Sequence, residues 1–255
     1  MTHATRAVAA ETRPRTSTLD RATLMRLAAT EYDRFATLLR ALTPEDWTRP
    51  TECDGWDVRA MASHALGMAE MAASIREGSR QQKAAKKRGG VFIDALSSLQ
   101  VEERSHLTPA QLTDRFLVVG PRAARARRRT PGLIRRRRMP VQQTVGGRPE
   151  TWSLGYLIDT ILTRDPWMHR LDISRATGHP LNLTADHDGI LVADVAHEWA
   201  IRHARPCHLH LTGPVGGAWT FGVDGPALDI DAIEFCRTLS GREPAADLLA
   251  TEVPF

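Results

Sequence analysis

The feature that most constrains this chain is the stretch from Arg164 to Gly178, RDPWMHRLDISRATG, because it places polar side chains at helical spacing. Asp165, His169 and Asp172 are four and three residues apart, and positions i, i+4 and i+7 share one face of an α-helix. Apolar residues continue this face upstream, so the pattern directs a carboxylate and an imidazole into the protein interior. Buried polar groups need partners, and two such groups one turn apart can supply two ligands to a metal ion.

Four segments before Gly178 have apolar residues at helical spacing. Thr108, Pro109 and Gln111 form a capping signal at the start of the third segment, and Gly178 follows the fourth as a typical C-terminal capping residue. The predicted helices span Ser17–Leu42, Asp57–Glu77, Thr108–Arg129 and Trp152–Thr177. Four helices with inward-facing histidine and carboxylate groups predict a mainly α fold, a four-helix bundle with a metal site in its core.

His64 lies on the apolar face of the second predicted helix. The residues at helical spacing from it are apolar or small: Ala60, Met61, Gly67 and Met68. A single histidine on such a face is more often a hydrogen-bonded core side chain than a metal ligand. Because Asp165 and His169 occupy another helix of the same bundle, we nevertheless include His64 as the third candidate ligand.

A strongly basic segment, Arg122–Arg138, contains nine arginines. Clustered arginines can neutralise nucleic-acid phosphates, but this segment has no interleaved aromatic residues and no recognisable nucleic-acid-binding motif accompanies it. We therefore expect a solvent-facing basic segment, some of whose arginines could attract an acidic substrate, with nucleic-acid binding as the weaker alternative. The polar sequence QQKAAKKRGG, residues 81–90, is expected to form a mobile loop.

The composition changes after Gly178, where short strand patterns appear. We expect a helix over His187–Arg205, a hairpin formed by CHLHLTG and AWTFGV around a GPVGG turn, and a closing helix over Ile230–Leu239. The predicted organisation is a disordered tail at residues 1–16, a helical bundle at residues 17–179 and a small α+β domain at residues 180–255.

The overall composition favours a soluble cytoplasmic protein. Apolar residues make up 42% and charged residues 25% of the chain, as in ordinary globular domains. The chain has no apolar run of the roughly 18 residues that a membrane helix needs, and its first residues lack the apolar core of a secretion signal. The three cysteines, Cys53, Cys207 and Cys236, are scattered without a CxxC pair, which suits a reducing compartment.

Three stretches together resemble the mycothiol-dependent maleylpyruvate isomerase family, a branch of the DinB-like metal-binding bundles. The first, CDGWDVRAMASHALG, contains a Gly-Trp pair followed by His64, and the second is the stretch RDPWMHRLDISRATG. The third, LHLTGPVGGAWTF with the later LSGR, is similar to the small C-terminal domain of that family. The resemblance extends over residues 17–255.

The resemblance implies a DinB-like four-helix bundle, a small α+β C-terminal domain and a divalent metal, usually zinc. The metal ligands would be His64, Asp165 and His169, and Asp172 could orient one imidazole. The implied cosubstrate is mycothiol, a small thiol whose pKa a metal would lower. The thiolate would attack a small electrophilic substrate, so the resemblance implies a transferase that forms a conjugate or a cis–trans isomerase.

Two alternatives stay open. The family often has glutamate where this chain has Asp165, and Pro166 follows it; a proline inside a helix removes the hydrogen bond to the Leu162 carbonyl. Asp165 could therefore cap a helix that begins at Pro166 instead of binding a metal. The bundle could also be a non-catalytic metal-binding, ligand-binding or regulatory module, because a fold does not determine a function. The sequence leaves the substrate, the metal and the oligomeric state undetermined.

Overall fold

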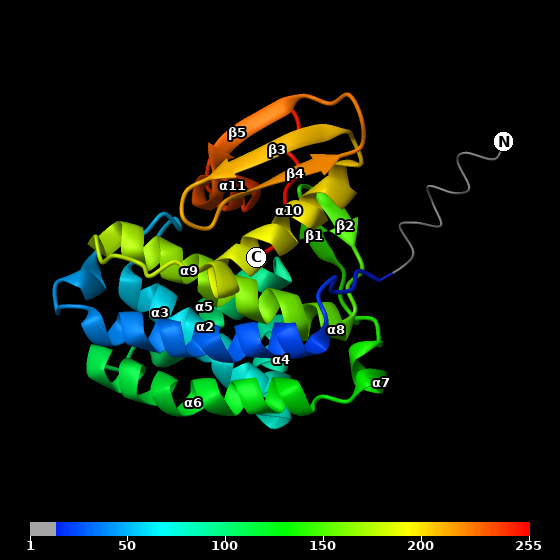
Figure 1. Ribbon diagram of the computed structural model, residues 1–255. Coiled ribbons are helices and arrows are strands. Elements are labelled where there is room, and N and C mark those ends of the chain that lie inside the picture. The colour runs from blue at the N-terminus through cyan, green and yellow to red at the C-terminus, as the bar shows by residue number, and fades with distance from the viewer. Residues whose placement is uncertain (1–13) are drawn as a thin grey trace. The chain divides into compact units, whose positions relative to one another are not determined.

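The computed structural model describes residues 14–255, which its contacts divide into two compact units (Figure 1). The helical unit consists of Arg21–Arg135 and Ile158–Leu181. The C-terminal unit consists of residues 14–20, Arg136–Leu157 and Asn182–Phe255. Most of the tail predicted at residues 1–16 lies outside the described residues. No helix in the described part of the chain is long and apolar enough to cross a membrane.

The helical unit is a bundle in which α3 packs against α6 and α9, and α2 packs against α6 and α9 (Figure 1). Its core contains the stacked rings of Phe35 and Phe116, whose centroids are 4.9 Å apart. The long helices are α2 (Arg21–Ala41), α3 (Val58–Ala73), α4 (Ile75–Arg88), α5 (Phe92–Arg104), α6 (Pro109–Arg129) and α9 (Leu162–Thr177). Two short helices complete the unit, a 3-10 helix at Asp46–Thr48 and α7 at Gly132–Arg135. The predicted mainly α fold is confirmed.

The helix ends follow local sequence signals closely. The Asp57 side chain accepts a hydrogen bond from the Ala60 amide at 2.7 Å and caps α3 at the residue where the predicted helix begins. Thr108 and Gln111 form the predicted capping box at the start of α6. Gly178 ends α9 with a positive φ of 75°, the left-handed conformation that glycine adopts readily.

The loop predicted at residues 81–90 is wrong, because the chain is helical up to Arg88 in α4. Gln81 is fully buried, and its side chain donates a hydrogen bond to the Gly67 carbonyl of α3 at 3.2 Å. It also accepts one from Gln100 of α5 at 2.8 Å. This polar helix is stabilised by buried hydrogen bonds to two neighbouring helices, whose contribution its own composition does not reveal.

The expectation that the basic segment faces solvent is wrong for two of its arginines. Arg127 is 2% exposed and Arg135 is 8% exposed. Arg127 lies in the last turn of α6 and donates hydrogen bonds into the start of α9, and Arg135 forms an ion pair with Asp159. Both guanidinium groups are therefore part of the interior of the helical unit.

The helix predicted over Trp152–Thr177 is interrupted. It consists of α8 (Leu154–Tyr156), a π-helical turn at Leu157–Ile161 and then α9, with Pro166 inside α9. Asp165 is the fourth residue of α9, so the alternative in which it caps a helix beginning at Pro166 is wrong. A π-turn widens the helix locally, and such turns often occur at functional sites.

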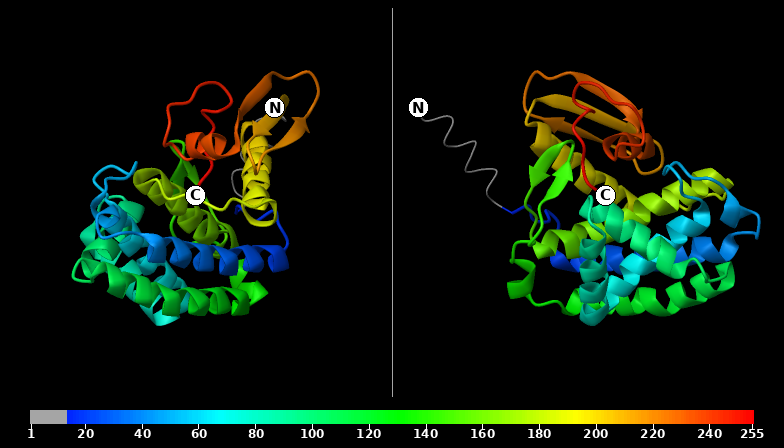
Figure 2. Two further views of the ribbon diagram at one scale, coloured as in Figure 1. Left: turned by 60° about the vertical axis from the view of Figure 1, so that its left-hand side comes forward. Right: turned by 180° about the vertical axis from the view of Figure 1, so that it is seen from behind.

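The C-terminal unit contains a three-stranded sheet in the order β4-β3-β5, with α10 and α11 beside it (Figure 2). The antiparallel pair β3 (Cys207–Thr212) and β4 (Gly217–Phe221) confirms the predicted hairpin, whereas β5 (Ala227–Asp231), parallel to β3, was not predicted. Trp199 of α10 lies against Phe235 of α11, with ring centroids 5.3 Å apart. The remaining elements are β1 (Gln143–Val145), β2 (Arg148–Glu150), a π-turn at Ala185–Gly189, α10 (Ile190–His203) and α11 (Ala232–Leu239).

Residues 136–157 group with the C-terminal unit, although the predicted bundle extended over residues 17–179. The physical reason is visible at Glu150 of β2. Its carboxylate accepts hydrogen bonds from Arg15 at 3.0 Å and from Arg202 of α10 at 2.6 Å. Whether either unit folds as an independent domain stays a prediction.

Candidate metal centre

His64, Asp165 and His169 meet in the interior of the helical unit. His64 lies on α3, and the other two side chains are one turn apart on α9. Asp165 Oδ1 lies 3.3 Å from His64 Nε2 and 3.5 Å from His169 Nε2. The two imidazole rings are nearly perpendicular, with centroids 5.2 Å apart. The structure therefore brings together all three residues that the sequence suggested as metal ligands.

Asp172 lies behind His169, at the far nitrogen of the imidazole. Its Oδ2 atom is 3.1 Å from His169 Nδ1, and the carboxylate is fully buried. An ionised carboxylate can only accept, so Nδ1 carries a proton, and Nε2 is the ring nitrogen that faces Asp165. A carboxylate that fixes the tautomer of a histidine in this way is common in metal sites.

Two further side chains border the cluster. The Trp56 ring is tilted against both imidazoles, with centroids 5.1 Å from His64 and 6.1 Å from His169. The Cys53 thiol lies 4.0 Å from Asp172 Oδ2. Sequence reasoning did not identify Cys53 as a neighbour of the site. Cys53 and Asp172 are 119 positions apart in the sequence, so no local pattern relates them. The one available signal was that Cys53 lies three residues before Trp56.

The cluster holds its charge in a buried environment. Burial tends to raise the pKa of Asp165, but the adjacent His64 and His169 outweigh this effect and hold the pKa below its usual range. Burial likewise tends to lower the pKa of His169, yet the charge of Asp165 and the hydrogen bonds to both carboxylates raise it well above its usual value. The electrostatics therefore favour an ionised Asp165 with positive charge beside it.

The donor set fits a divalent cation. Asp165 Oδ2 is buried and has no hydrogen-bond partner among residues 14–255, although an ionised oxygen without a partner is costly in the interior. Two imidazole nitrogens and one carboxylate oxygen are a ligand set that zinc and similar ions accept, with positions left for further ligands. The unpartnered oxygen and the composition of the cluster thus both suit a bound cation.

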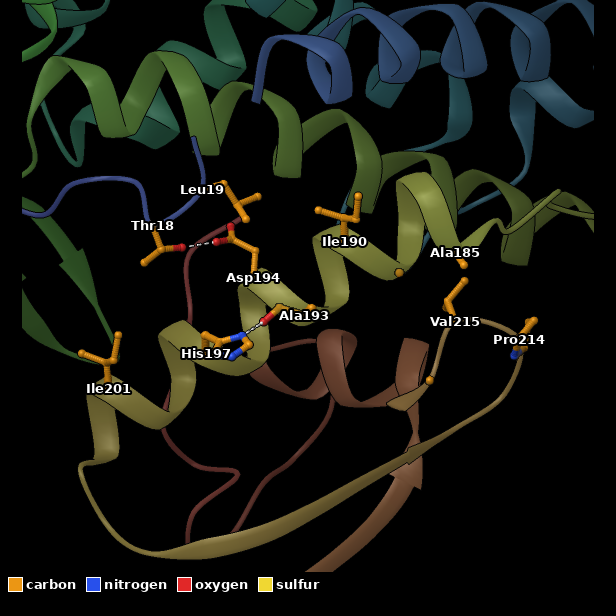
Figure 3. Close-up of a pocket in the computed structure, with 12 residues that line it drawn as sticks. Thr18, Leu19, Ala185, Ile190, Ala193, Asp194, His197, Ile201, Pro214 and Val215 are labelled. Carbon is orange, nitrogen blue, oxygen red and sulfur yellow. Dashed lines mark hydrogen bonds between the residues drawn. The ribbon is translucent and has the colours of Figure 1, made fainter. Parts of the chain in front are cut away.

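A separate pocket of about 550 Å³ lies within the C-terminal unit (Figure 3). Its wall is mainly apolar and includes Leu19, Ile190 and Val215. The Thr18 hydroxyl donates to Asp194, and His197 Nδ1 donates to the Ala193 carbonyl at 2.7 Å, so each of these polar side chains has a partner. This pocket suits a small apolar molecule and contains no counterpart of the donor set on α3 and α9.

Comparisons with known proteins agree with the geometry. Residues 28–174, more than half of the chain, match the family described as the mycothiol maleylpyruvate isomerase N-terminal domain. A crystal structure of the mycothiol-dependent maleylpyruvate isomerase is similar to this chain with a TM-score of 0.55 and 16% identity, over 88% of this chain and 90% of that chain.

The crystal structure of a histidine-to-alanine mutant of that isomerase gives a TM-score of 0.53 and 14% identity over the same shares of the two chains. At these identities the likeness establishes the fold alone. No curated protein matched the chain. The matched range includes His64, Asp165, His169 and Asp172.

Proposed function

Since the chain belongs to the mycothiol maleylpyruvate isomerase family, we propose that it is a metal-dependent enzyme that uses mycothiol as a cosubstrate. The proposed reaction is cis–trans isomerisation of a small electrophilic substrate, or transfer of the thiol to it. A cytoplasmic location, expected from the scattered cysteines, belongs to the same proposal.

One observation carries the metal part of this proposal: the buried Asp165 carboxylate lies between two imidazoles and retains an oxygen without a hydrogen-bond partner in the described part of the chain. His64 and His169 would contribute nitrogen ligands, and Asp165 would contribute an oxygen ligand. Zinc is the ion that this set favours, because zinc accepts mixed nitrogen and oxygen ligands and leaves a position free in catalytic sites.

A bound divalent cation would lower the pKa of a coordinated thiol, so that thiolate is available near neutral pH. The protein's own residues prepare the site for this role. Asp172 accepts a hydrogen bond from the Nδ1–H group of His169 and thereby directs Nε2 toward Asp165. The Trp56 ring lies beside both imidazoles and supplies an apolar neighbour on that side of the site.

The two proposed reactions begin with the same step. The thiolate sulfur adds to an electrophilic carbon of the substrate and converts a carbon–carbon double bond into a single bond that can rotate. Expulsion of the thiolate after rotation regenerates the double bond as its geometric isomer. If the sulfur is retained and a proton is added, the product is a thioether conjugate.

The first experiment measures the metal content of the purified protein, followed by turnover of maleylpyruvate with and without mycothiol. We expect about one zinc per chain, turnover that requires mycothiol, and loss of both after treatment with a chelator. His64→Ala should lose zinc and activity, while His197→Ala, which alters an exposed histidine of the C-terminal unit, should retain both.

Other outcomes would distinguish the two proposed reactions or contradict the proposal. Zinc binding without turnover of this or related cis-alkene substrates would favour a ligand-binding or regulatory module. Release of a thioether instead of an isomer would favour the transferase. Absence of bound metal, together with activity that resists chelation, would contradict the metal-dependent mechanism.

A further inference from the structure

Pro166 creates a defect in the backbone of α9, one residue after Asp165. In a regular α-helix the Leu162 carbonyl would accept a hydrogen bond from the amide of residue 166, but proline has no N–H group. The preceding π-turn at Leu157–Ile161 adds a second irregularity. Its hydrogen bonds join residues five positions apart, and the pattern returns to the four-residue spacing of an α-helix at the start of α9. The segment that carries Asp165 therefore needs donors from elsewhere.

The donors come from Arg127 at the end of α6. Its Nη1 atom donates to the Leu162 carbonyl at 2.9 Å, which replaces the missing amide of Pro166. Its Nε atom donates to the Ile158 carbonyl at 2.7 Å, inside the π-turn. The remaining bonds reach the Asp159 carbonyl at 3.4 Å, the Thr163 hydroxyl at 2.5 Å and the Tyr32 hydroxyl at 3.4 Å.

The environment of Arg127 shows that the backbone is its main partner. The side chain is 2% exposed, and its guanidinium carbon lies 5.7 Å from the centroid of the Tyr32 ring. Within the described residues it forms no ion pair with a carboxylate, although a buried guanidinium ordinarily requires one. Five N–H donors in a planar arrangement match five acceptors, and lysine could not reproduce this arrangement.

We propose that Arg127 is a positioning residue for the metal centre. It holds the start of α9, where Pro166 leaves the Leu162 carbonyl without a backbone donor, so that Asp165 faces His64. Arg127 does not bind the metal, and its effect passes through the backbone of Leu162 and Thr163. The metal-related part of this inference rests on the proposed function, whereas the coupling between Arg127 and Pro166 does not.

The test is a double-mutant cycle with Arg127→Met and Pro166→Ala. Arg127→Met removes the donors and keeps an apolar chain of similar length. Pro166→Ala gives residue 166 an amide that can bind the Leu162 carbonyl. Zinc affinity is measured by competition with a chromophoric chelator, the coordination geometry by the visible spectrum of the cobalt-substituted protein, and stability by the urea midpoint of the metal-free protein.

We expect Arg127→Met to lower zinc affinity at least about 10-fold, as for other residues that orient ligands, and to alter the cobalt spectrum. In the Pro166→Ala background the same substitution should lower zinc affinity by a smaller factor, because the Leu162 carbonyl can then accept a hydrogen bond from the amide of residue 166. Arg104→Met is the matched control: Arg104 is equally buried in the same unit but bonds Glu70 and Gln100. It should lower the urea midpoint without changing the cobalt spectrum.

An unchanged zinc affinity in Arg127→Met would overturn the inference, as would an equal loss in both backgrounds. If Arg127→Met does not fold, the cycle is measured with Arg127→Lys, which keeps the charge but cannot bind all five acceptors. If the unsubstituted protein binds no zinc, the proposed function fails. The urea midpoints then decide the inference alone, because equal shifts in both backgrounds exclude coupling between Arg127 and Pro166.

Discussion

Asp165 carries the only anionic charge among the three proposed ligands, so its substitution tests the metal centre directly. Asp165→Asn preserves the size of the side chain and replaces an anionic oxygen with a neutral amide. We expect zinc affinity to fall by at least about 10-fold, the lower limit found when weaker partners of metal sites are removed. Chelator competition measures this change.

Asp165→Glu distinguishes the loss of charge from the loss of position. It restores the carboxylate but extends it by one methylene beside Pro166, so we expect a zinc affinity between those of the unsubstituted protein and Asp165→Asn. Full zinc retention in Asp165→Asn would contradict the ligand role and leave Asp172 as the next candidate carboxylate.

Asp172 should affect the metal centre through His169. Its Oδ2 atom is 3.1 Å from His169 Nδ1, whereas the other ring nitrogen, Nε2, faces Asp165. We expect Asp172→Ala to reduce zinc affinity by about 10–100-fold, because the imidazole loses the partner that fixes its tautomer. Isothermal titration with zinc measures the change. Asp33→Ala, at an exposed position of α2, should leave the affinity unchanged; an equal loss there would show that the effect is not specific.

At the scale of single elements, sequence reasoning succeeded where the determining contacts are local. The cap at Asp57 and the capping box at Thr108 involve residues three positions apart, so the sequence displays both partners. The polar helix α4 was missed because Gln81 is stabilised by Gly67 and Gln100 of other helices. Strand β5 was missed because it pairs with β3, from which β4 separates it in the sequence.

Helix α9 shows the same limit at the candidate site. The sequence correctly placed His64, Asp165 and His169 on inward faces, since helical periodicity determines which residues share a face. It also left open a helix that begins at Pro166, because it considered only the backbone donors of the helix itself. The compensating donor, Arg127, is 35 residues from the Leu162 carbonyl that it binds, and no periodicity relates the two.

The buried part of the basic segment should contribute to stability. Arg135 forms an ion pair with Asp159 and donates to the Thr130 carbonyl at 3.0 Å, with 8% of the residue exposed. We expect Arg135→Ala to lower the free energy of unfolding by about 3 kcal/mol, since it leaves Asp159 without this cation. Arg136→Ala, at the exposed next position, should change it by less than about 0.5 kcal/mol. Urea unfolding measures both, and equal small effects would contradict the structural role of Arg135.

At the scale of the whole molecule, the chain passes between its two units more than once. The C-terminal unit combines residues 14–20, residues 136–157 and the last 74 residues, Asn182–Phe255. Glu150 connects these three segments through Arg15, Trp152 and Arg202. A linear reading with one boundary near residue 180 could not show this arrangement, because the segments share no sequence pattern and are related only by their contacts.

Glu150 should give the C-terminal unit an acid-sensitive stability. Burial tends to raise its pKa, but hydrogen bonds from Arg202 and Arg15 lower it below the usual value of 4.5. The unfolded chain therefore binds a proton more readily than the folded one, so the contribution is present above pH 4.5 and is lost as pH falls through the lower folded pKa. The stability difference between the unsubstituted protein and Glu150→Gln should be largest near neutral pH.

The measurement is urea unfolding at a series of pH values. The difference caused by Glu150→Gln should shrink below pH 4.5, whereas the exposed substitution Glu45→Gln should give a small difference throughout. A Glu150→Gln effect that stayed constant down to strongly acidic pH would mean that the carboxylate charge does not contribute to stability.

The position of Glu150 also has a consequence for the nascent protein. Arg202 follows Glu150 by 52 residues, so at a synthesis rate of about 5–20 residues per second Glu150 is synthesised roughly 3–10 s before Arg202. A ribosome stalled after Leu181 would have produced every segment of the helical unit and none of α10. The carboxylate of Glu150 in β2 would then still lack its hydrogen bonds from Arg202, although Arg15 would already have been synthesised.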